Sequence, residues 1–148
     1  MKDRVRPPAL YETQVLDVLK DRGDFQTKPK GLMLAAAVGY GLCGDRLGEV
    51  GTDQLDGEGI RLEYFRDFDD AFIDALAVTV VGDLNIMAPA REEERVEIFE
   101  KCAYLGLREM HRACFEERPE DPLLGILSLI DALAHSGTND LPGLEDSM

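Results

Sequence analysis

The chain of 148 residues carries 30 acidic and 16 basic side chains, a net charge of −14, and 45% of its residues are hydrophobic. This length suits one domain with its own hydrophobic core and is too short for two domains that each bury a core of ordinary size. An acidic surface repels the phosphate backbone, which argues against DNA binding by the surface as a whole and leaves only a local basic patch open.

The three cysteines are odd in number and widely spaced. This pattern is typical of reduced thiols in a cytosolic protein and not of a disulfide framework. The first residues are charged, so they do not resemble a signal peptide. Because the longest apolar runs fall far short of the roughly 20 residues that span a bilayer, we expect a cytoplasmic protein without membrane contact.

Two helices are predicted in the first third of the chain. Residues 1–8 are basic and contain two prolines, which predicts an extended arm. A first helix should run from about Ala9 to Asp21 and end at Gly23. A second should follow Thr27 and run from Pro29 to about Leu42. The expected inner side chains of the first helix are Leu10, Val15, Val18 and Leu19.

The second helix is nearly uncharged all round, which places it in the middle of the domain. Gly39 and Gly41 each cost about 1 kcal/mol relative to alanine, so either close packing offsets this cost or the helix frays near Tyr40. The glycine-rich stretch from Asp45 to Gly59 is predicted to be a long surface loop. Ile60 to Phe65 is predicted to be an extended segment or a helical turn, because a lone strand has no evident partner.

A third helix is predicted from about Asp69 to Val81, and a last one from Pro122 to about His135. From residue 136 to 148 the chain is acidic and rich in turn-forming residues, which predicts a disordered tail. The expected core side chains of the third helix are Phe72, Ile73, Leu76, Ala77 and Val80. Those of the last helix are Leu123, Leu124, Ile126, Leu127, Ile130 and Leu133.

The longest predicted helix covers residues 91–117 and is amphipathic. Glutamates at its start suit the helix dipole, and Pro119 marks its end. The sequence therefore predicts an all-α fold: one helical domain over residues 9–135, with about five helices packed along this one. The apolar stripe consists of Val96, Phe99, Ala103, Leu107, Met110 and Cys114, widened by Ile98, Cys102 and Leu105. Among the residues expected on the opposite, solvated side is Glu100.

No arrangement of residues predicts catalysis, a cofactor or a metal. His111 and Cys114 are three residues apart on one helical face, but a zinc site normally needs four ligands. The acidic clusters at residues 67–74 and 92–97 stand at predicted helix starts, where the dipole alone favours them. The glycines match no nucleotide-binding motif.

The basic groups near the N-terminus are the candidate phosphate contacts. Lys2, Arg4 and Arg6 lie in the arm, and Lys28 and Lys30 flank the start of the second helix, where backbone N–H groups favour an anion. The alternative interpretation is that these charges keep one face soluble or meet an acidic partner.

Several short stretches, in order over residues 4–115, carry a family resemblance. They are RVRPP at 4–8, GDFQT at 23–27, AAAVGY at 35–40, IRLEYF at 60–65, GDLNI at 82–86, ERVEIFE at 94–100 and YLGL at 104–107. In these stretches the chain resembles the DNA phosphorothioation (Dnd) system-associated protein 4 family. The resemblance implies a bacterial DNA-modification or antiphage-defence setting, and it carries over no catalytic residue.

The leading hypothesis is a non-enzymatic accessory or adaptor subunit of a DNA phosphorothioation-linked modification or restriction system, acting by contact with its protein components. We expect a homodimer in preference to a monomer, with the wide apolar stripe as its seam. The second hypothesis is a small DNA-binding protein that uses the basic arm and the start of the second helix.

Overall fold

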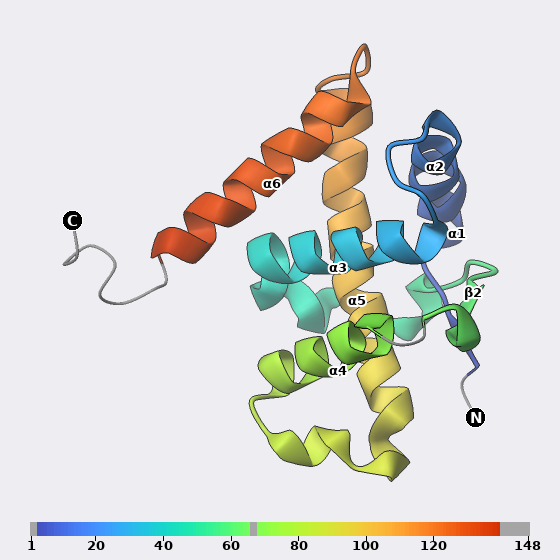
Figure 1. Ribbon diagram of the computed structural model, residues 1–148, viewed down its shortest axis with the longest axis vertical. Helices are drawn as coiled ribbons and strands as arrows, with labels where there is room; N and C mark the ends of the chain where they lie inside the picture. The colour runs from blue at the N-terminus through green and yellow to red at the C-terminus, as the bar shows by residue number, and fades with distance from the viewer. Residues whose placement is uncertain (1–2, 66–67, 140–148) are drawn as a thin grey trace.

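The computed structural model describes residues 3–65 and 68–139. One long helix, α5, forms the axis of the molecule, and α3 crosses it near its middle (Figure 1). The helices are α1 (Ala9–Tyr11), α2 (Val18–Arg22), α3 (Lys28–Cys43), α4 (Phe68–Val81), α5 (Glu92–His111) and α6 (Pro122–Asn139). The strands are β1 (Arg4–Val5) and β2 (Ile60–Arg61). The predicted all-α fold class is confirmed.

The long helix predicted over residues 91–117 is present as α5 with a short helical turn at each end. A 3-10 turn, Pro89–Arg91, leads into α5, and a π-helical turn, Arg112–Glu116, continues it. The six stripe residues Val96, Phe99, Ala103, Leu107, Met110 and Cys114 are all at most 3% exposed. Because the chain's own helices cover this stripe, it offers no seam for a second copy.

Helices α3 and α5 cross with their backbones in direct contact. A Cβ atom on Gly39 would lie 1.8 Å from the carbonyl oxygen of Cys102, and one on Gly106 would lie 1.6 Å from that of Ala35. Each helix therefore contributes a glycine at the point of closest approach. Of the two predicted outcomes, close packing is the one observed: α3 does not fray near Tyr40, since it continues to Cys43.

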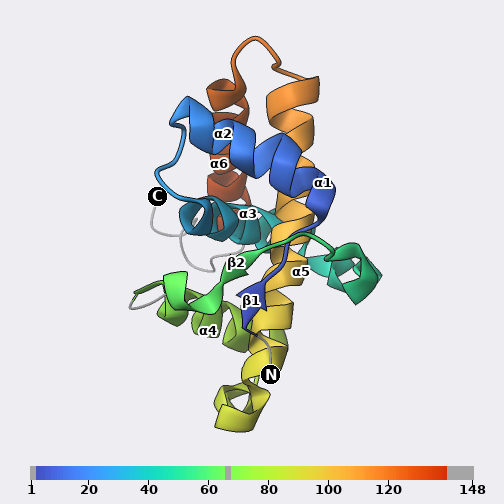
Figure 2. The ribbon, with the colours of Figure 1, turned by 90° about the vertical axis from the view of Figure 1, so that its right-hand side faces the viewer.

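The N-terminal arm is extended, as predicted, but it is part of the folded domain. β1 pairs antiparallel with β2, Arg4 opposite Arg61 and Val5 opposite Ile60 (Figure 2). Val5 is fully buried. The arm is thus the strand partner of β2 that the sequence did not reveal. Ile60 to Phe65 was predicted to be an extended segment or a helical turn, and after β2 it continues as a 3-10 turn at Leu62–Tyr64.

Glu100 lies inside the domain, contrary to its predicted place on the solvated side of the long helix. Its side chain is 1% exposed, and its Oε2 accepts a hydrogen bond from the backbone N–H of Arg6 at 2.6 Å. The arm covers this carboxylate and supplies a donor to it. An amphipathic pattern could not show this, because the covering strand is distant in sequence.

The predicted first helix is interrupted by a π-helical turn at Glu12–Asp17. A π turn advances the chain by more residues per turn than an α-helix, so it shifts which side chains face inward. Val15, Leu16 and Leu19 are fully buried, whereas Leu10 is 56% exposed and Val18 is also exposed. The last two were predicted to point inward, and that prediction is wrong, because the inner face is formed by Glu12, Val15, Leu16 and Leu19 and both residues lie off it.

The stretch from Asp45 to Gly59 is more ordered than the predicted loop. It contains 3-10 turns at Gly44–Glu49 and Thr52–Gln54. Val50 and Leu55 from this stretch are buried in a small second apolar cluster with Cys43 and Leu105. The segment therefore adds to the hydrophobic core beside α3 and α5.

α4 and the turn after it are fastened to α5 by one arginine. The Arg95 guanidinium donates to Asp74 Oδ1 at 3.0 Å and to the carbonyl oxygens of Ile86 at 2.8 Å and Ala88 at 3.0 Å. Of the predicted core of α4, Ile73, Leu76 and Ala77 are buried, and Phe72 and Val80 are half-buried against the same cluster.

α6 packs against the rest of the molecule by one face only. It leaves the end of the long helix at an angle and extends away from α5 (Figure 1). Ile126 and Leu129 are buried, and Gly125 lies against the Ala113 carbonyl, where a Cβ would come within 2.5 Å of the oxygen. α6 ends at Asn139, past the predicted His135, and residues 140–148 of the predicted tail lie outside the described part.

Candidate functional site

A groove of about 670 Å³ lies beside the start of α3 and brings together five basic side chains. They come from separate segments: β1, α2, the first turn of α3, and β2. This volume is within the usual range of ligand pockets, roughly 300 to 1,000 Å³. The basic residues are Arg4, Lys20, Lys28, Lys30 and Arg61, and the other lining residues are Thr27, Pro29, Gly59, Ile60, Tyr64 and Asp69. We call this site the basic groove.

The start of α3 is fixed by its capping residue. The Thr27 side-chain oxygen accepts a hydrogen bond from the backbone N–H of Lys30 at 3.3 Å, and Pro29 occupies the first turn. Threonine is a favourable N-cap and proline is tolerated in the first turn. These two residues set the direction in which α3 leaves the groove and hold Lys28 and Lys30 at its edge.

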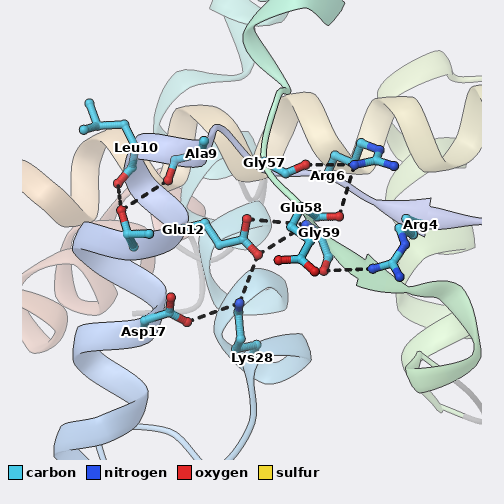
Figure 3. A network of polar contacts seen from close by, with 11 residues as sticks. Arg4, Arg6, Ala9, Leu10, Glu12, Asp17, Lys28, Gly57, Glu58 and Gly59 are labelled. Atoms are coloured by element: carbon cyan, nitrogen blue, oxygen red, sulfur yellow. Dashed lines mark hydrogen bonds and ion pairs between the residues drawn. The ribbon is translucent and has the colours of Figure 1, made fainter.

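The buried carboxylate of Glu12 links two segments that line the groove, the start of α3 and the residues before β2 (Figure 3). Its Oε1 accepts hydrogen bonds from Lys28 Nζ at 3.0 Å and from the backbone N–H of Gly59 at 3.2 Å. Asp17 lies 3.2 Å from the same ammonium group. Gly59 has φ +83°, a left-handed conformation that favours glycine. Glu12 thus joins the π turn, α3 and the approach to β2.

Lys28 keeps its charge in this setting. Burial alone lowers the pKa of its ammonium group, but the hydrogen bonds that this group donates to Glu12 and Asp17 outweigh burial and raise the pKa above the ordinary value. Lys28 is therefore cationic at neutral pH. Lys30 is more open, and its Nζ lies 3.1 Å from Asp69 Oδ1.

The predicted phosphate-contact residues divide between this groove and other places. Arg4, Lys28 and Lys30 line the groove, and Arg4 Nη1 lies 3.5 Å from the Gly59 carbonyl oxygen. The Arg6 Nη1 instead donates to the carbonyl oxygens of Gly57 at 2.9 Å and Glu58 at 3.1 Å. Lys2 lies outside the described residues.

Sequence reasoning missed Lys20, Arg61 and Tyr64 as groove residues. The signal for Arg61 and Tyr64 was the alternation in IRLEYF, which gains meaning only once the arm is known to be its strand partner. Lys20 follows the π turn, so a regular helical repeat could not place it. Long-range pairing, and not local pattern, assembles the groove.

A second surface is the outward face of α6. Leu123, Leu124, Leu127 and Ile130 recur at helical spacing and are 44% to 51% exposed. All four were predicted to lie in the core, and that prediction is wrong, since no described element covers this side of α6. A contiguous row of four large aliphatic side chains is a feature of interaction surfaces. We call it the outer face of α6.

The cysteines lie in settings unsuited to nucleophilic chemistry. All three thiols are free and buried. Burial raises the pKa of Cys102 to about 12 and that of Cys114 to about 11. Burial, followed by the neighbouring Glu109 carboxylate, also raises the pKa of Cys43. These thiols stay protonated at neutral pH, and a protonated thiol is a poor nucleophile.

His111 packs between aromatic rings, with centroids 5.7 Å from Tyr11 and 6.0 Å from Phe115. Its Nδ1 lies 3.4 Å from Glu116 Oε1. Over residues 3–65 and 68–139, no group of three or more His, Cys, Asp or Glu side chains is placed to hold a metal ion. Within the same ranges no helix has the length and apolar character needed to cross a bilayer.

The fold and the two surfaces define a small helical protein with a basic groove and an apolar helix face suited to binding. The chain belongs to the family described as DNA sulphur modification system-associated protein 4, which matches it over residues 4–144. This match confirms the resemblance found in the sequence. The family is described as associated with a DNA sulphur modification system. Comparisons with curated proteins and with solved structures found no match to the chain.

Proposed function

We propose that the protein is a non-enzymatic accessory subunit that binds a protein component of the DNA sulphur modification system through the outer face of α6. The family membership supports the setting. The single observation that carries the contact is the row formed by Leu123, Leu124, Leu127 and Ile130, which is about half exposed on a helix that packs by its other side.

The energetic argument rests on the area that a partner would cover. Full burial of one large aliphatic side chain contributes about 1.5 to 3 kcal/mol. Each of the four is already half-buried, so covering the remainder contributes about 1 kcal/mol apiece. A central cluster of this kind is typical of the few residues that dominate a protein interface.

The chemistry of the partner follows from charge. The chain carries −14, and within α6 up to His135 the formal charge is that of Asp131 alone. Two copies would repel each other through their acidic surfaces, whereas a basic partner would be attracted. The outer face of α6 therefore fits an apolar surface that is bordered by Lys and Arg on a component of the modification system.

The test is binding by calorimetry between the purified chain and each co-expressed protein component of the system. Leu127→Asp places a charge in the centre of the row and is expected to weaken binding by tenfold or more. Leu84→Asp is the matched control, because Leu84 is 74% exposed on a different element. Circular dichroism of both variants checks that they remain folded.

Two results would remove the proposal. In one, Leu127→Asp binds the component as tightly as the wild-type chain. In the other, analytical ultracentrifugation shows a wild-type dimer that Leu127→Asp dissociates, which assigns the outer face of α6 to a second copy.

A further inference from the structure

The basic groove concentrates positive charge on an acidic molecule. Five of the 16 Lys and Arg residues line it, whereas Asp69 is the sole contribution of the 30 acidic residues to the described lining. A hollow lined by one sign of charge raises the local concentration of oppositely charged ligands. The groove therefore selects an anion even though the whole chain repels one.

The groove also offers an apolar wall and an open aromatic ring. Pro29 and Ile60 form part of the lining, and Tyr64 is 62% exposed although it is a large aromatic residue. A small inorganic anion would not use these groups. A ligand that matches them carries negative charges and flat apolar faces in the same unit.

We propose that the basic groove binds a single strand of nucleic acid, with the phosphates held by the basic side chains and one base stacked on Tyr64. Proteins that bind single strands combine a positively charged groove with aromatic rings, because every base has a stacking face. The groove has room for a nucleotide unit and is too small to enclose a duplex. This inference is independent of the contact made by α6.

The basic residues divide into two roles. Lys30 and Arg61 have side chains that are 56% and 57% exposed, so they can turn from Asp69 and Glu63 towards a phosphate. The Arg61–Glu63 pair is exposed on both sides and costs little to exchange. Lys28 is held by Glu12 and Asp17, whose carboxylates offset its charge, so it acts as a positioning residue that fixes the start of α3 at the groove.

The test is fluorescence anisotropy with the full chain and labelled 12-nucleotide single strands of DNA and of RNA. Duplex DNA and a phosphorothioate-containing strand of the same sequence complete the set of probes. The wild-type chain is expected to prefer single strands, and log K is expected to fall linearly with log salt. The relative affinities of the DNA, RNA and phosphorothioate strands identify which strand the groove takes.

Matched variants separate charge from stacking. Lys30→Glu with Arg61→Glu is expected to abolish binding, whereas Arg46→Glu with Arg118→Glu, an equal reversal of two exposed charges outside the groove, leaves most of it. Tyr64→Ala is expected to weaken binding about 5- to 150-fold, and Tyr64→Phe is expected to retain it. Leu127→Asp is expected to bind strands as the wild-type chain does, so the groove and the α6 contact are tested separately.

The proposal is overturned if no strand binds at low salt. It is also overturned if Arg46→Glu with Arg118→Glu reduces binding as much as the double reversal in the groove, because the interaction would then be general electrostatics. Equal binding by Tyr64→Ala and the wild-type chain, with duplex preferred, would replace it with backbone contact to a duplex.

Discussion

Replacement of Gly106 by alanine tests how the two central helices are held together. On an open helix this change stabilises by about 1 kcal/mol, because glycine is a poor helix former. In this protein the added methyl group would lie 1.6 Å from the carbonyl oxygen of Ala35 and 2.4 Å from its carbonyl carbon. Both are backbone atoms, so no side-chain rotation can make room.

The cost of Gly106→Ala follows from the distance that the helices must separate. Carbon–oxygen contacts between packed backbones are about 3.3 Å or longer, so α3 and α5 must part locally by roughly 1.7 Å. A gap of even 0.5 to 1 Å loses about a quarter to a half of the dispersion energy of each contact across it. Overpacking alone costs about 1 to 3 kcal/mol and occasionally more. We expect a net loss of about 3 kcal/mol in the free energy of unfolding.

Urea titration and thermal unfolding followed by circular dichroism measure this loss. For a chain of this size, about 3 kcal/mol corresponds to a fall in Tm of roughly 10 °C. Gly48→Ala is the control, since nothing lies within 4 Å of its Cβ position, and no loss of stability is expected there. A Gly106→Ala variant as stable as the wild-type chain would refute the backbone contact between α3 and α5.

Two further predictions concern buried groups. Arg95→Met should lower the free energy of unfolding by about 1 to 3 kcal/mol, because it removes the donor of the buried Ile86 carbonyl. Arg91→Met is the control, because Arg91 forms an ion pair with Glu94 on the surface, and it should leave the free energy of unfolding in urea unchanged. Equal losses in the two variants would contradict this role for Arg95. Burial raises the pKa of the Cys102 thiol from 9.0 to about 12, so this thiol loses its proton at a lower pH in the unfolded chain than in the folded chain. The free energy of unfolding should therefore keep this contribution below pH 9 and decline above pH 9 by up to about 1.4 kcal/mol per pH unit. Urea titrations at pH 8 to 10.5 should give a shallower decline for Cys102→Ala, and an identical slope would count against the prediction.

Local sequence patterns were enough to predict the elements that are marked by helical periodicity or by residues typical of helix ends. The stripe of α5, the Thr27 start of α3 and the Gly23 end of α2 follow from periodicity and capping, which are read within a few residues. The pairing of β1 with β2 could not be predicted in this way, because it joins segments more than 50 residues apart. The burial of Glu100 depends on that pairing and was missed with it.

The candidate sites show the same division. Lys28 and Lys30 were identified because both flank a recognisable helix start, but their union with Arg61 and Tyr64 needed the strand pair. α6 is apolar around most of its circumference, apart from Ser128, Asp131 and His135, so hydropathy alone assigned its outer residues to the core. Only the arrangement of the other helices shows that the side carrying Leu127 has no cover among the described elements.

The bond between the Arg6 backbone N–H and Glu100 spans 94 residues and affects how the protein is made. The arm is synthesised before its carboxylate partner, which follows about 5 to 20 s later at ordinary elongation rates. Until then, Val5 has no closed core to enter. β1 therefore takes its final place only after Glu100 has been translated, and the basic groove, which needs β1, is completed no earlier.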